Sequence, residues 1–170
     1  MPIPRLATSL LATLLLGCGQ SFLPTWLEGD AGKPILGPVE IFRVEDVELD
    51  FAGRIDTGAE ASAIHATDLE LDTPVELEAA AGRIVEFTLE NEDGQRRRLS
   101  RVVADAVQVR TTHGTETRLR VPLYLSHRGV RKSILVSLRD RDPMTYKLLV
   151  GRDWLGDDFL IDVSREAPER

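Results

Sequence analysis

The sequence predicts an all-β domain of about seven to nine strands, barrel-like or sandwich-like, on the basis of three observations. From Val39 onward apolar and polar residues alternate with a period of two, as in strands that bury one face. Turn-forming residues separate these alternating segments. No segment of about twelve residues or more shows a helical apolar stripe, so we expect only a short helix after Gly151.

The alternating segments follow one another along the chain. Each places its apolar side chains on one face of a strand and its polar side chains on the other. Turn signals lie between them at Glu92-Asp93-Gly94, His113-Gly114 and His127-Arg128-Gly129. The apolar positions are Val47, Leu49 and Phe51, then Val85, Phe87 and Leu89, then Leu119, Val121, Leu123 and Leu125, then Ile134, Val136 and Leu138, and finally Phe159, Ile161 and Val163.

The first part of the chain is predicted to lie outside this domain. Met1 to Arg5 is a short, weakly basic start, and the apolar run from Leu6 to Leu16 suits a secretory signal peptide. The run is too short to span a bilayer, which needs about 20 apolar residues. It ends in Leu15-Leu16-Gly17-Cys18, which resembles the lipobox of bacterial lipoproteins.

That resemblance implies cleavage before Cys18 and a diacylglycerol on its sulfur. Cys18 is the single cysteine of the chain, which strengthens the prediction; a simple cleaved signal peptide with an incidental cysteine is the alternative. We predict a signal peptide over residues 1–17, then a lipidated cysteine and a flexible Gly- and Pro-containing tether over residues 18–38. The folded domain is expected over residues 39–165, with a tail at 166–170.

Composition and charge narrow the classes of function. A chain of 170 residues suits one domain, and a hydrophobic fraction of 42% is sufficient for a core. The net charge of −7 argues against nucleic-acid binding and against electrostatic attachment to anionic lipid. The lipid anchor would hold the protein at the membrane, so we expect a periplasm-facing envelope protein. Gly19 is not the acidic residue associated with inner-membrane retention in enteric bacteria, which favours the outer membrane.

The candidate catalytic loop is Asp56-Thr57-Gly58-Ala59, which directly follows an alternating apolar segment. A carboxylate at a strand end can act as an acid or a base. Gly58 lets the backbone turn tightly, Thr57 can hydrogen-bond locally or across an interface, and Ala59 leaves room. The same letters also form common surface turns, so the triplet alone does not identify a site.

A second motif favours the catalytic interpretation. Leu148–Leu155 contains a short buried apolar strand, then a glycine, then a helical turn. An Asp-Thr-Gly-Ala loop combined with a later apolar-apolar-Gly-Arg-Asp segment resembles the retropepsin half-barrel. The resemblance implies a closed β-barrel half, and the longer spacing between the two motifs implies an inserted or extended hairpin. The residues implied to support the catalytic loop are Ala59, Leu149, Val150, Gly151 and Arg152.

A closer resemblance covers about residues 40 to 164. It is to bacterial proteins formerly labelled ATP-dependent zinc proteases, which are linked in genomes to RimK-type ATP-grasp ligases and are now described as having a retropepsin-like aspartic endopeptidase domain. It implies an aspartic-type endopeptidase with Asp56, Thr57 and Gly58 as catalytic residues. The motifs that carry it are Arg54 to Ser62, Ile64-His65-Ala66, Ser137 to Arg141, Met144, Tyr146, Leu148 to Leu155, and Phe159 to Val163.

The residues do not support the zinc and the ATP of the older label. Zinc proteases often use a His-Glu-x-x-His motif, and His65, His113 and His127 are the only histidines and do not form it. The glycine-rich loop that binds ATP phosphates is also missing from the sequence. We therefore expect no metal and no cofactor.

Two more residues are candidates for substrate binding or for tuning the site. Arg54 would lie on the same side of its strand as Asp56, where a guanidinium would lower the pKa of the carboxyl group. His65 follows the loop and can approach the site; a structural role is the alternative. We interpret Arg96-Arg97-Arg98 as a solvated strand face and Arg139-Asp140-Arg141-Asp142 as an ion-paired loop beside the site.

Aspartic proteolysis uses two carboxylates that share one proton. The chain has one Asp-Thr-Gly, and Asp140, Asp153 and Asp162 lack that context. The mechanism therefore predicts a homodimer with Asp56 of each subunit at the two-fold axis, acting on a protein or peptide substrate. Two alternatives stay open: a catalytically silent peptide-binding or assembly module of an envelope complex, and a partner protein that carries the second aspartate.

Overall fold

The computed structural model describes residues 32–111 and 114–168. The predicted signal peptide, Cys18 and most of the predicted tether lie outside these residues. Within them strands dominate, and the single α-helix is α1 (Arg152–Leu155), directly after Gly151. The all-β fold and the short helix are therefore confirmed. No helix in this part of the chain is long and apolar enough to cross a bilayer.

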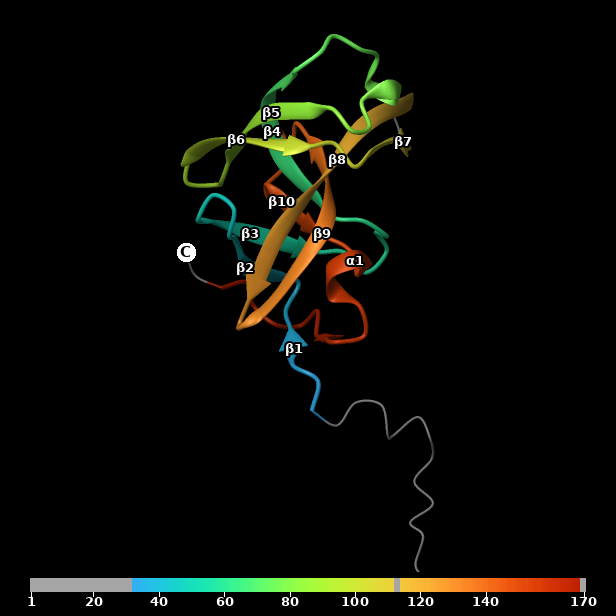
Figure 1. The fold of residues 1–170 in the computed structure, drawn as a ribbon. Coiled ribbons are helices and arrows are strands. Elements are labelled where there is room, and N and C mark those ends of the chain that lie inside the picture. Colours follow the sequence, from blue (N-terminus) through green and yellow to red (C-terminus); the bar gives the residue numbers. More distant parts are fainter. Residues whose placement is uncertain (1–31, 112–113, 169–170) are drawn as a thin grey trace, which may run out of the picture. The chain divides into compact units, whose positions relative to one another are not determined.

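Most of the described strands belong to one sheet (Figure 1). They are β2 (Val39–Val44), β3 (Leu49–Ile55), β4 (Ala63–Leu71), β5 (Ile84–Glu90), β6 (Arg96–Val102), β7 (Asp105–Thr111), β8 (Gly114–His127), β9 (Val130–Arg139) and β10 (Leu148–Val150). Their hydrogen-bonded order is β10-β3-β2-β8-β9-β4-β5-β6, and β7 pairs with β8. Because β10 also pairs with β4, the path from β10 to β4 closes into a ring. This ring is the closed half-barrel that the resemblance to retropepsins implies.

The buried side chains form one cluster, mainly aliphatic with a few aromatic ones, to which strands of the ring and also β5 contribute. Alternation explains it: Leu49 and Phe51 of β3 are buried, whereas Asp50 between them is exposed. Val47, which we expected in the same strand, lies in the turn before it. At one end of the core Trp154 stacks on Phe159 with ring centroids 5.0 Å apart.

Two hairpins account for the long spacing between the two motifs. β5 and β6 pair along their whole length and extend the sheet beyond β4, while β7 and β8 form the second hairpin. The short 3₁₀-helix η1 (Leu77–Ala79) lies between β4 and β5. In Figure 1 the β5–β6 hairpin lies at the end of the barrel away from β1 (Ile35–Leu36).

The folded part begins earlier than we predicted. β1 pairs in parallel with β11 (Leu160–Ile161), so a tether extending to residue 38 is wrong for its last residues. Two paired residues are too few to show an alternating pattern in the sequence, which is why this strand escaped notice. The last strand is also shorter than expected, because Val163 lies beyond β11 and is 79% exposed.

Candidate active site

Asp56 lies at the end of β3, at the point where the chain leaves the barrel wall. β10 lies between β3 and β4, parallel to the first and antiparallel to the second. Val150 is opposite Ile55, and its carbonyl oxygen accepts a hydrogen bond from the Asp56 N–H group at 2.9 Å. The backbone N–H group of the candidate catalytic residue is therefore fixed by β10.

The loop after Asp56 donates hydrogen bonds to only one of the two oxygens of its carboxylate. Oδ1 accepts hydrogen bonds from the N–H groups of Gly58 (3.0 Å) and Ala59 (3.1 Å), and no described residue donates a hydrogen bond to Oδ2. Asp56 is half-buried, whereas Thr57 and Gly58 are exposed. One carboxylate oxygen is thus oriented by the loop, and the loop tip is open for contact with another molecule.

The second motif lies directly behind this loop. A Cβ atom on Gly151 would come within 2.8 Å of the Ala61 carbonyl carbon, so only glycine fits where β10 turns into α1. The Arg152 N–H group donates to Ala59 O at 2.9 Å. The Arg152 guanidinium donates to the carbonyl oxygens of Thr57 (3.0 Å) and Gly58 (3.1 Å). Arg152 therefore binds the candidate catalytic loop through both its backbone and its side chain.

Sequence reasoning missed a third support, formed by Ser62 and Asp153. The Asp153 carboxylate accepts hydrogen bonds from Ser62 N (2.9 Å) and Ser62 Oγ (2.7 Å), and Ser62 Oγ accepts one from Gly151 N (3.0 Å). Ser62 is fully buried. These residues lie about ninety positions apart in sequence, and nothing in either local pattern signals that they meet.

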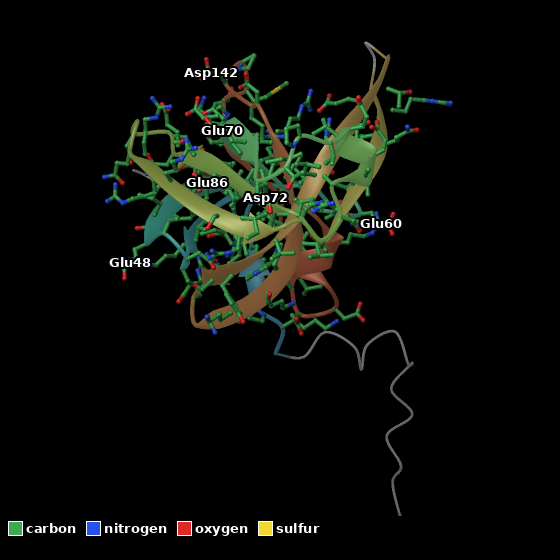
Figure 2. All side chains as sticks on the ribbon, turned by 45° about the horizontal axis from the view of Figure 1, so that its top comes forward. Glu48, Glu60, Glu70, Asp72, Glu86 and Asp142 are labelled. Atoms are coloured by element: carbon green, nitrogen blue, oxygen red, sulfur yellow. The ribbon has the colours of Figure 1, made fainter. Side chains whose placement is uncertain are left out.

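A pocket of about 780 Å³ begins beside the loop at Ala59 and Glu60. Figure 2 shows Glu60 on a different side of the barrel from Glu70 and Glu86. β7 and β8 contribute one wall, and β9 and Leu149 contribute the other. We call this pocket the groove. Asp56 is not among the residues that line the groove, but Ala59, three residues after it, is.

The groove is rich in arginine although the whole chain has a net charge of −7. Among the described residues, Glu60 and Asp153 are the only carboxylates that line it, and Asp153 already binds Ser62. The arginines that line it are Arg110, Arg118, Arg120, Arg139 and Arg141. An arginine-rich wall of this kind favours ligands that carry carboxylates.

Arg141 has no acidic partner among the described residues. It is 7% exposed, and its Nε donates to the Tyr146 carbonyl oxygen at 3.2 Å. Burial lowers its pKa, and the nearby charges of Arg139 and Arg118 lower it further. Arg118 and Arg139 share Glu116, at 2.6 Å and 3.5 Å. The Arg141 guanidinium is therefore buried without an ion pair within the described part of the chain, although Glu92 lies near enough to raise its pKa.

Arg54, His65 and the run at 139–142 differ in part from expectation. Arg54 is exposed on β3, and no ion pair or hydrogen bond joins it to Asp56 within the described chain. His65 is buried, and its Nδ1 accepts a hydrogen bond from Arg141 N at 2.9 Å. Within the run, Arg139 pairs with Glu116 and Asp142 pairs with Lys147, so its ion pairs are formed with residues outside the run. In the part of the chain that the structure covers, no three His, Cys, Asp or Glu side chains form a metal-binding group.

Comparisons with known proteins give two findings. A family model described as RimB-like, the retropepsin-like aspartic endopeptidase RimB, matches residues 35–169. A crystal structure of Lpg0085, a protein of unknown function (DUF785) from Legionella pneumophila subsp. pneumophila, is similar with a TM-score of 0.64 and 24% identity. The match covers 79% of this chain and 96% of the Legionella chain, and at this identity it shows the fold alone. The comparison with curated proteins gave no match.

Proposed function

Because this chain belongs to the RimB-like family of retropepsin-like aspartic endopeptidases, we propose that it cleaves peptide bonds as a homodimer, in substrates that present carboxylates to the groove. The observation that carries the proposal is the Asp56 carboxylate, oriented through Oδ1 at the end of β3 with an exposed loop tip beside it. A single chain supplies one such carboxylate, so the catalytic pair requires a second subunit.

The reaction needs the two carboxylates in different protonation states. The ionised Asp56 removes a proton from a water molecule, which attacks the scissile carbonyl carbon. Asp56 of the partner subunit, protonated, hydrogen-bonds the carbonyl oxygen and later transfers its proton to the leaving amine. Two carboxylates a few ångströms apart share one proton because ionising both is electrostatically costly.

Hydrogen bonds within the loop after Asp56, and from Arg152 to that loop, keep this geometry fixed during the reaction. Two N–H groups hold Oδ1 of Asp56, and Arg152 holds the carbonyl oxygens of the next two residues. A carboxylate held in place before substrate binds needs little reorganisation in the transition state. Thr57, exposed at the loop tip, is available to bind the same loop of the partner subunit.

Arg141 favours acidic substrates over neutral ones. A buried guanidinium without a carboxylate partner loses solvation, and a substrate carboxylate that binds it restores the lost interaction. Arg118 and Arg139 lie close enough to lower the pKa of Arg141, although both also pair with Glu116. The substrate carboxylate can belong to an acidic side chain or to the chain terminus. Cleavage of two peptides, one lacking the acidic side chain and one with a blocked terminus, distinguishes these sources.

The proposal is tested by peptide cleavage with the Asp56→Asn variant. We expect kcat/KM on a Glu-containing peptide to fall at least about 1,000-fold, because amide nitrogen cannot replace the general base. Asp157→Asn is the matched control, since Asp157 is exposed and follows α1 at a distance from the loop in sequence. Equal cleavage by the wild type and by Asp56→Asn would contradict the proposal and favour a catalytically silent peptide-binding module.

The membrane anchor belongs to the same proposal. We infer that Cys18 carries the lipid and that the barrel acts in the bacterial envelope, facing the periplasm, with the outer membrane preferred because Gly19 follows the cysteine. Metabolic labelling with radioactive palmitate tests this directly. Label should enter the wild-type protein and be lost in Cys18→Ser; label retained by the variant would contradict the anchor.

A further inference from the structure

The segment 140–147 joins β9 to β10 and holds Arg141 at the groove. Both ends of this segment bind His65, which lies in β4. The Arg141 N–H group donates to His65 Nδ1 at 2.9 Å, and the His65 N–H group donates to the Lys147 carbonyl oxygen at 2.7 Å. His65 is only 2% exposed, so it fixes the segment from inside the barrel wall.

His65 Nδ1 has two neighbours that require different protonation states. Accepting the Arg141 N–H hydrogen bond requires a lone pair on Nδ1, so the ring is unprotonated at that atom. Asp140 Oδ1 lies 3.4 Å from the same Nδ1, and this contact becomes an attractive ion pair only when Nδ1 carries a proton. A backbone N–H group cannot reverse its role, so the two contacts exclude each other.

We propose that His65 is a positioning residue for Arg141, and that a proton on Nδ1 exchanges the Arg141 N–H contact for Asp140 and displaces the Arg141 guanidinium from the groove. The step takes up one proton from solvent and breaks no covalent bond. Its consequence for substrate rests on the proposed function, in which Arg141 binds a substrate carboxylate. Acidification therefore weakens carboxylate binding without a change in Asp56.

The charges around His65 come from several elements. Lys147, the last residue of the connecting segment, opposes protonation, whereas Asp140 and Asp142 of the same segment and Glu90 of β5 favour it. Arg139 of β9 lies opposite His65 in the strand pairing. Burial is the largest influence and lowers the pKa of His65 from its usual value of 6.5, followed by Lys147. The exchange therefore takes place below pH 6.5.

The first measurement follows both residues by NMR. The full chain carrying Asp56→Asn, which removes turnover, is titrated from neutral to acidic pH while the His65 ring nitrogens and the Arg141 Nε–Hε signal are recorded. We expect the two sets of signals to change with one common midpoint. An Arg141 signal that does not move at the His65 midpoint would overturn the proposal.

The second measurement uses a ligand whose own charge does not titrate. A fluorescent peptide with cysteic acid in place of glutamate keeps its sulfonates ionised throughout the range, and its affinity is read by anisotropy. We expect affinity to fall about tenfold as His65 becomes protonated, the size of one lost charge-assisted hydrogen bond. His65→Asn should abolish this fall, because its Oδ1 is attached where Nδ1 was and accepts the Arg141 N–H at every pH.

His127→Asn is the matched control, since His127 is also buried but contacts Ile41 and Glu40 instead. It should leave the pH dependence of affinity unchanged. An unaltered pH dependence in His65→Asn would overturn the proposal even if that variant folds well. If Arg141 follows His65 by NMR but the peptide binds at no pH, the positioning role holds and the proposed carboxylate site fails, so the two failures are distinguishable.

Discussion

Arginines gather in two regions of this barrel, and their surroundings differ. On the β5–β6 hairpin Arg96 pairs with Asp68 and Glu90, and Arg98 pairs with Glu70 and Glu86. Asp68, Glu70 and Glu86 are exposed and Glu90 is partly exposed. Figure 2 shows Glu70 and Glu86 apart from Glu60. In the groove Arg118 and Arg139 pair with Glu116 and Arg120 pairs with Asp105, whereas Arg141 has no ion pair among the described residues. Paired, exposed charges keep a strand face soluble, whereas an unpaired, buried charge is suited to bind a ligand.

The largest effect that tests this contrast is expected from Arg141→Met. The substitution keeps the length of the side chain and removes its charge, so kcat/KM on a Glu-containing peptide should fall about 100-fold through loss of a buried charge-assisted contact. Cleavage of the matching Gln peptide should change far less. Arg98→Met is the control on the hairpin, and an equal loss in both variants would remove the distinction between the two regions.

The pH dependence of stability should also differ between the regions. Burial lowers the pKa of His65, so the unfolded chain binds its proton more readily than the folded one. The free energy of unfolding is therefore highest above pH 6.5 and decreases as the pH falls toward the folded-state pKa, by at most about 1.4 kcal/mol per pH unit. Urea unfolding at several pH values measures this, and His65→Asn should flatten the slope. If His65→Asn keeps the wild-type slope of unfolding free energy against pH, a group other than His65 is responsible for that slope.

Arg141→Met should cost activity and yet stabilise the fold. Removing a buried guanidinium that has no acidic partner and lies near two other arginines should raise the free energy of unfolding by about 1 kcal/mol. Urea unfolding at neutral pH gives the value. A destabilised variant would indicate that the hydrogen bond from Nε to the Tyr146 carbonyl oxygen stabilises the fold by more than the desolvation of the guanidinium destabilises it.

The smallest effect is expected on the hairpin. Arg98 forms exposed ion pairs with Glu70 and Glu86, and pairs of this kind contribute little because water screens them. Arg98→Met should leave the thermal midpoint within about 2 °C of wild type, as read by circular dichroism. A larger drop would show that the hairpin charges act as a network.

The fold was predictable where the local pattern is strong. Alternation identified the main strands around Phe51, Phe87 and Leu123, because each is long enough to bury one face. β1 and β11 were beyond this reasoning, since two-residue strands have no measurable period and exist only because they pair with each other. Interpreting the Arg96 run as a solvated strand face was right, as β6 shows.

From the sequence we could predict which backbone segments form the site, but not the contacts between their side chains. The loop at Asp56 and the segment after Leu148 have recognisable sequences because their turns require specific residues, as Gly151 does against Ala61. Ser62–Asp153 and His65–Arg141 join residues far apart in the chain, and single-sequence patterns contain no information on such pairs. For the same reason the sequence did not distinguish Arg98, which forms ion pairs, from Arg141, which has none among the described residues. The two differ in their spatial partners and not in their neighbours in sequence.

The central claim is that Asp56 is half of a catalytic pair completed by a second subunit. The most direct test is a crystal structure of the full chain with a transition-state analogue peptide, read at the separation of the two Asp56 carboxylates. We predict a two-fold dimer in which their nearest oxygens lie about 3 Å apart, close enough to share a proton. A monomer, or a dimer whose Asp56 carboxylates are too far apart for one water molecule to bridge, would contradict the account.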